Sequence, residues 1–94
     1  QITAEAFLEE QPSLVRAVGE AIDQRDAAAL KVAAHTLKGA IRYFGPLEAF
    51  EQAFRLEQMG TAGRVEGAEP LFEQLKRQVD RLVPAVEKYV AANR

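Results

Sequence analysis

The chain lacks several residue types from which small proteins commonly build reactive sites. Cysteine and tryptophan are absent, and histidine, methionine and serine occur once each. Without cysteine there is no disulfide framework, no thiolate zinc site and no thiol nucleophile. A single histidine has no second histidine with which to share a metal, and Ser13 forms no apparent Ser–His–acid set. The reactive chemistry open to the chain therefore centres on His35.

Long apolar runs and an excess of positive charge are also missing. No apolar stretch approaches the roughly 18 residues of a membrane-spanning helix, and no secretory signal is visible. Twelve lysines and arginines face fourteen acidic residues, for a formal net charge of −2, whereas nucleic-acid binders are usually basic. We expect no nucleic-acid partner, no membrane contact by this domain and a cytoplasmic location, even for a membrane-anchored parent protein.

The 94 residues suffice for one domain, which we expect to cover residues 1–94. The chain begins with Gln1 instead of methionine, which favours an excised part of a longer protein. Alanine, leucine, glutamate, glutamine and arginine dominate, and these are the strongest helix formers. β-Branched residues are few, so the composition predicts an all-α fold.

Hydrophobic periodicity divides the chain into four helical segments. We expect them at residues 3–24, 27–44, 46–60 and from 68 or 70 to 91. Asp26 is a plausible N-cap for the second segment, and Pro46 suits the first position of the third. Because the connections are short, neighbouring helices should be antiparallel, as in an up-and-down four-helix bundle.

Prolines interrupt two of these segments. Proline removes one helical hydrogen bond and clashes with the preceding turn. Pro12 therefore predicts that the first segment is either a kinked helix or a short helix followed by a longer one. Pro84 predicts a kink or a fray near residues 80–83.

The second segment separates a core face from an exposed one. At about 100° per residue, five apolar residues cluster in one direction: Leu30, Ala34, Leu37, Ile41 and Phe44. His35 lies roughly 140° from them, so it should face solvent or a partner. In the third segment we expect the buried stripe to contain Leu47, Phe50, Ala53, Phe54 and Leu56.

Three cations share the face of His35. Lys31, Lys38 and Arg42 stand at i−4, i+3 and i+7, which helical geometry places on about the same side. Nearby cations disfavour the imidazolium, so we expect a mostly neutral ring with a free lone pair, as a nucleophile needs. The same cations would stabilise a phosphoryl group on the ring. A solvated charged face around an idle histidine is the alternative.

Gly39 follows His35 by one helical turn. Glycine inside a helix costs about 1 kcal/mol relative to alanine, although alanine is plentiful in this chain. The missing side chain would leave room beside the imidazole for the backbone of a second protein. A close contact between two helices is the alternative reason, but the helical wheel puts Gly39 opposite the core.

The rest of a phosphoryl-transfer site is missing from the chain. There is no glycine-rich phosphate loop, and the three aspartates, at positions 23, 26 and 80, are not spaced to hold Mg²⁺ near His35. Phosphoryl transfer relies on positioning and charge stabilisation, usually with a metal. We therefore expect a phosphoryl carrier without a complete active site, with no metal or cofactor of its own and with Mg²⁺ supplied by its partner.

These residues also carry a family resemblance. His35–Thr36–Leu37–Lys38–Gly39, followed by Phe44–Gly45, resembles the signature of histidine-containing phosphotransfer (HPt) domains, the relay modules of multistep two-component phosphorelays. The likeness extends over nearly the whole chain. Ile41, Arg42 and Tyr43 are bulkier than the small residues that usually follow the family's glycine, which leaves the identity of the partner open.

The resemblance implies roles for individual residues. His35 would accept a phosphoryl group on Nε2 from a receiver-domain aspartate and pass it to another receiver. Lys38 would lie beside that group, and Glu57 would reach the other ring nitrogen. The residues implied in docking the receiver are Lys31, Val32, Thr36, Gly39 and Arg42.

The resemblance further implies a monomeric, bacterial signalling module that works with receiver domains and a histidine kinase. The kinase and this domain would belong to one polypeptide if the chain is the tail of a hybrid sensor kinase. Three alternatives remain open at this point. They are a non-catalytic HPt-like interaction bundle, the phosphoacceptor domain of a chemotaxis-type kinase, and a small nucleic-acid binder with a basic face.

Overall fold

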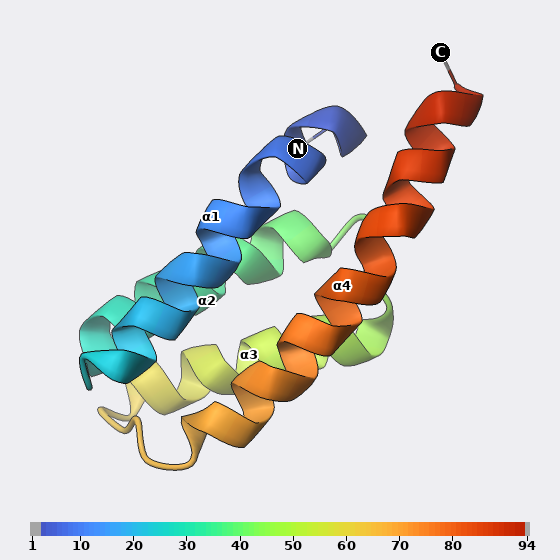
Figure 1. The fold of residues 1–94 in the computed structure, drawn as a ribbon. Helices are drawn as coiled ribbons and strands as arrows, with labels where there is room; N and C mark the ends of the chain where they lie inside the picture. Colours follow the sequence, from blue (N-terminus) through green and yellow to red (C-terminus); the bar gives the residue numbers. More distant parts are fainter. Residues whose placement is uncertain (1–2, 94) are drawn as a thin grey trace.

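The computed structural model describes residues 3–93, and it contains four α-helices in these residues. Their bounds are α1 Ala4–Asp23, α2 Ala27–Ile41, α3 Leu47–Thr61 and α4 Ala68–Ala92. Consecutive helices run antiparallel, and α1 packs against α4 as well as α2, which closes the bundle (Figure 1). The predicted all-α, up-and-down four-helix bundle is confirmed. Within residues 3–93, no helix is long and apolar enough to cross a membrane.

Side-chain caps begin the first two helices. The Thr3 hydroxyl accepts a hydrogen bond from the Ala6 amide at 3.0 Å, and the Asp26 carboxylate accepts one from the Ala29 amide at 3.0 Å. Each cap satisfies an amide that has no partner inside the helix. The predicted N-cap at Asp26 is therefore confirmed, whereas Pro46 is the N-cap of α3 and not its first helical residue.

Helix α2 ends three residues before the predicted end at Phe44. The amides of Phe44 and Gly45 both donate to the Ile41 carbonyl, at 2.9 and 2.7 Å, so the chain turns here. Pro46 follows, and a proline disfavours helical geometry in the residue before it. Arg42 becomes the C-cap of α2. The Phe44 ring still covers the core, because its centroid lies 5.3 Å from that of Phe7.

Both internal prolines are accommodated without a break. Helix α1 runs unbroken through Pro12, so the split into two helices does not occur, and α4 continues past Pro84 without the fray expected at residues 80–83. Both prolines are exposed, so water can reach the carbonyls that they leave without a helical partner. Buried residues on either side of each proline keep the helix packed on the bundle.

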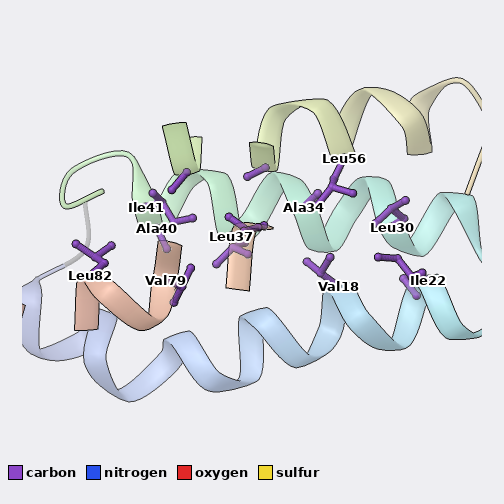
Figure 2. Close-up of a cluster of buried hydrophobic side chains, with 14 of the residues drawn as sticks. Val18, Ile22, Leu30, Ala34, Leu37, Ala40, Ile41, Leu56, Val79 and Leu82 are labelled. Atoms are coloured by element: carbon purple, nitrogen blue, oxygen red, sulfur yellow. The ribbon is translucent and has the colours of Figure 1, made fainter. Parts of the chain in front are cut away.

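The core lies on the side of α2 that the sequence predicts. Leu30, Ala34, Leu37 and Ile41 are all completely buried. In Figure 2 they point toward side chains of the other three helices. Those labelled partners are Val18 and Ile22 of α1, Leu56 of α3, and Val79 and Leu82 of α4. The opposite face of α2 is left to solvent.

Gly60 brings the backbones of α2 and α3 into contact. A Cβ atom on Gly60 would lie 2.5 Å from the Lys31 amide nitrogen and 2.7 Å from the Ala27 carbonyl oxygen. Real side chains do not make contacts this short, so only glycine fits without moving one helix. Gly60 is therefore a buried packing residue inside α3. It fixes how α3 lies along α2.

We expect Gly60→Ala to destabilise the bundle by about 1–3 kcal/mol, because overpacking a tight contact outweighs the better helix propensity of alanine. Urea denaturation followed by circular dichroism measures this change. Gly39→Ala is the matched control, because a Cβ there meets nothing within 4 Å, and it should gain up to about 1 kcal/mol. Equal shifts in the two variants would contradict the packing role of Gly60.

Candidate functional site

His35 projects from the solvent side of α2. Its side chain is 68% exposed, although Ala34 and Leu37 on the core side of the same helix are completely buried. Helical periodicity alone predicts this separation. The imidazole is therefore accessible to another macromolecule.

A carboxylate from α3 contacts one nitrogen of the ring. The Nδ1 atom of His35 lies 3.0 Å from Oε2 of Glu57, a side chain that is only 17% exposed. An ionised carboxylate can only accept hydrogen bonds. The Nδ1 atom therefore carries a proton, and in the neutral form of the ring Nε2 keeps the free lone pair.

Lys38 contacts the other oxygen of the same carboxylate. Its Nζ atom lies 2.7 Å from Oε1 of Glu57, and its side chain is 19% exposed. His35 and Lys38 stand three residues apart on one face of α2, so a single α3 side chain can reach both. The structure thus brings together three sequence-predicted site residues in a His35–Glu57–Lys38 triad.

Two aromatic rings of α3 lie against the lysine. The Nζ atom of Lys38 is 4.9 Å from the ring centroid of Phe54 and 5.9 Å from that of Phe50. Phe50, Phe54 and Glu57 follow one another at helical spacing, so one face of α3 carries both rings and the carboxylate. The expectation that Phe54 belongs to the buried stripe is wrong, since this ring is 42% exposed, and Phe50 is only half-buried.

The buried face of α3 is made of smaller residues than the sequence analysis expects. Leu47 is also exposed, and the core face consists of Ala49, Gln52, Ala53, Leu56 and Gly60. Ala53 and Leu56 are buried as predicted, and the small residues Ala49, Ala53 and Gly60 allow the close approach of α3 to α2. The spacing of three and four residues along this core face was the signal that could have identified it.

The pKa of Glu57 is lowered from its ordinary value. Burial by itself would raise this pKa, but hydrogen bonds from Lys38 and then from His35, together with the positive charge of Lys38, outweigh the burial. Glu57 is therefore ionised at neutral pH. This supports the assignment of the proton to Nδ1 of His35.

The other two predicted cations are not brought into the triad. Lys31 is exposed on α2, and the guanidinium carbon of Arg42 lies 5.9 Å from the ring centroid of its neighbour Tyr43. The placement of Lys31 and Arg42 beside His35 therefore stays a prediction from helical spacing. Only Lys38 joins the site, and Glu57 balances its charge.

A shallow groove follows the other side of His35, between α1 and α2. One part, of about 630 Å³, contains Val32 and Thr36 among mostly alanine side chains. A second part, of about 380 Å³, contains Gly39, Arg42 and Tyr43, and the two parts share Leu14 and Thr36. Four of the five predicted docking residues therefore line this groove.

The groove and the triad differ in what they can do chemically. In the neutral form of the ring, the triad presents the lone pair of Nε2 on an exposed side chain, beside an ammonium group. The groove presents apolar surface and a bare stretch of helix at Gly39. Among residues 3–93, no three histidine, aspartate or glutamate side chains come together as a metal site.

We expect Glu57→Gln to remove stability in a pH-dependent way. Because the pKa of Glu57 is lowered, its ionised form stabilises the fold above the ordinary pKa of 4.5, and this stability is lost as pH falls through the folded pKa. Urea denaturation between pH 7 and pH 3 should show the two stabilities converging as pH falls. Glu51→Gln, at an exposed position of α3, is the control. If the difference in unfolding free energy between the wild type and Glu57→Gln stays constant with pH, the expected pH dependence is wrong.

Comparison with known proteins agrees with the fold. The family model of the Hpt domain matches residues 3–85, which include all of α1, α2 and α3 and most of α4. No curated protein and no solved structure matches the chain. Hpt domains carry out histidine phosphotransfer in two-component phosphorelays, and they do so by interacting with receiver domains. Since the match spans most of its length, the chain belongs to the Hpt domain family.

Proposed function

We propose that His35 is the phosphoacceptor, and that it takes a phosphoryl group from an aspartyl phosphate of one receiver domain and passes it to an aspartate of another. The observation that carries this proposal is the contact between Nδ1 of His35 and the ionised Glu57 carboxylate at 3.0 Å. It leaves Nε2 as the only ring nitrogen with a lone pair, on a side chain that is open to solvent.

The transfer balances without any further reactant. The Nε2 lone pair attacks phosphorus, a bond between nitrogen and phosphorus forms, and the bond to the aspartyl oxygen breaks to release the aspartate carboxylate. The ring gains positive charge while Nδ1 keeps its proton, and Glu57 stabilises that charge. Passing the group to a second receiver is the same step in reverse. We expect Mg²⁺ at the receiver to stabilise the phosphate oxygens.

Lys38 is the cation placed to assist this step. Its ammonium group is bound to Glu57 in the unphosphorylated protein, and the flexible lysine stem allows it to approach a phosphoryl group on His35. Lys31 and Arg42 add positive charge to the same surface. Such charges favour encounter with an acidic partner and are weakened by salt.

The receiver would dock on the face that contains His35 and the groove between α1 and α2. Gly39 is the strongest support for this choice, because no atom of its own chain requires a glycine there. Val32 is 65% exposed, and Val32 and Thr36 extend the apolar surface beside His35. Lys31 and Arg42 would lie at the edges of the contact. Transient partners use small interfaces of this kind.

The proposed setting is a monomeric module served by a histidine kinase, within one hybrid polypeptide or as a separate chain. The phosphoacceptor domain of a chemotaxis-type kinase would use the same histidine but receive its phosphate directly from a kinase active site. A non-catalytic interaction bundle would bind a receiver with no transfer at all. These three possibilities differ in whether the chain becomes phosphorylated and in whether the phosphoryl donor is a receiver domain or a kinase.

The direct test is incubation with a phosphorylated receiver domain and Mg²⁺. We expect acid-labile label on the wild-type chain and none on His35→Gln, because the amide offers no lone pair of comparable nucleophilicity. Binding to the receiver should persist in His35→Gln. If receivers bind the wild type but never label it, the interaction bundle is correct and the relay is not.

Gly39→Ala should separate stability from function. We expect the folded state to gain up to about 1 kcal/mol from helix propensity, while transfer from a receiver slows by on the order of tenfold or more because the partner is displaced from the ring. Thermal unfolding and single-turnover labelling measure the two effects. Gly19→Ala in α1, whose Cβ would meet only the Phe72 ring, should not alter the labelling rate. Unchanged labelling by Gly39→Ala would contradict the proposed docking face.

A further inference from the structure

We propose that Phe54, assisted by Phe50, is a positioning residue for His35. The two rings hold the Lys38 ammonium group on Glu57, and Glu57 in turn keeps His35 in the tautomer protonated at Nδ1. The inference concerns the unphosphorylated protein, and it rests on the proposed function only for its effect on transfer.

Lys38 is confined between Glu57 and the aromatic rings of α3. A lysine on a helix surface has a long flexible stem, and exposed ion pairs are weak because holding two such side chains together opposes their rotational freedom. Lys38 is instead only 19% exposed, with Nζ 4.9 Å from the Phe54 ring and 2.7 Å from Glu57. The face of an aromatic ring is negative and attracts an ammonium group, most strongly when water is excluded.

Packing in the core does not require an aromatic side chain at Phe54. It is 42% exposed and is not among the buried residues of the bundle. Its ring faces the lysine, and so does that of Phe50 at 5.9 Å. An aliphatic side chain could cover the lysine stem equally well, but it would not attract the charged end.

Glu57 connects the lysine to the imidazole. Glu57 has two oxygens, and each has one partner, with Oε1 on Lys38 and Oε2 on His35. While the ammonium group holds Oε1, rotation of the carboxylate is restricted and Oε2 stays on Nδ1. Release of Lys38 would let the carboxylate turn away, and the proton could then move to Nε2, where it blocks the nucleophile.

The test uses the fact that His35 is the single histidine of the chain. Long-range ¹H–¹⁵N NMR spectra, recorded at a pH where the imidazole is neutral, report which ring nitrogen carries the proton. We expect the Nδ1–H form to dominate in the wild type and to lose population to Nε2–H in Phe54→Leu. Lys38→Met should cause the same shift, and the double variant should shift no further, because both changes break one chain of contacts.

Two further variants control for general effects. Phe54→Tyr keeps the ring face and should restore the wild-type tautomer. Phe72→Leu removes a ring that lies 4.9 Å from Lys76 on α4, the same distance as at the site, and should leave the His35 tautomer unchanged. An unchanged tautomer in Phe54→Leu would overturn the inference, and so would a shift in Phe54→Leu that adds fully to that of Lys38→Met.

The effect on transfer is a separate measurement. If the relay operates, Phe54→Leu should slow labelling by a receiver about three- to tenfold, the range that one partly desolvated contact of this kind would produce. The Phe50→Leu variant should have a smaller effect, since its ring is farther from Nζ. A tautomer shift without any labelling of the wild type would remove the proposed function and leave the positioning role intact. Normal labelling of the wild type, with no tautomer shift in Phe54→Leu, would support the proposed function and remove the positioning role.

Discussion

The site depends on one partly buried carboxylate that joins two side chains of the neighbouring helix. Glu57 can bridge His35 and Lys38 only if α3 lies at a fixed height along α2, and the contact of Gly60 with the backbone at Ala27 and Lys31 sets that height. Gly60 follows Glu57 by three residues, about one turn of the same helix. Packing and chemistry are therefore coupled, because a change that pushes the helices apart also moves the carboxylate away from the ring.

Charge balance explains why such a carboxylate is tolerated at the edge of the core. Burial disfavours ionised Glu57, whereas Lys38 and His35 favour it, and the second effect is the larger. Glu57 is therefore a charged hydrogen-bond acceptor, and each of its two carboxylate oxygens has one partner. A neutral acid in the same place could donate a proton to the ring, and the tautomer of His35 would then not be fixed.

The sequence predicts α2 well and α3 poorly, for a physical reason. In α2 the large apolar residues mark the core, so Leu30 and Leu37 fall inside and His35 outside. In α3 the core face contains Leu56 but otherwise mostly alanine and glycine, because the helix must come close to α2. The large rings of Phe50 and Phe54 lie against a lysine instead. Helical spacing also places Lys31 and Arg42 on the face of His35, but it does not predict where the charged ends of such long side chains lie. Only the family resemblance indicated Glu57, since its partner lies on another helix.

The two glycines inside α2 and α3 show which surface is left for a partner. At Gly60 an added methyl group would strike the backbone of α2, so the fold itself requires glycine. At Gly39 the same methyl group would meet nothing, and alanine would make the helix more stable. Nothing within the chain accounts for glycine at this position, which agrees with the proposal that a partner docks there. Gly39 lines the groove between α1 and α2, away from the aromatic rings of α3. We therefore propose that α3 organises the imidazole from one side, while the side that contains Gly39 stays open for the phosphoryl donor.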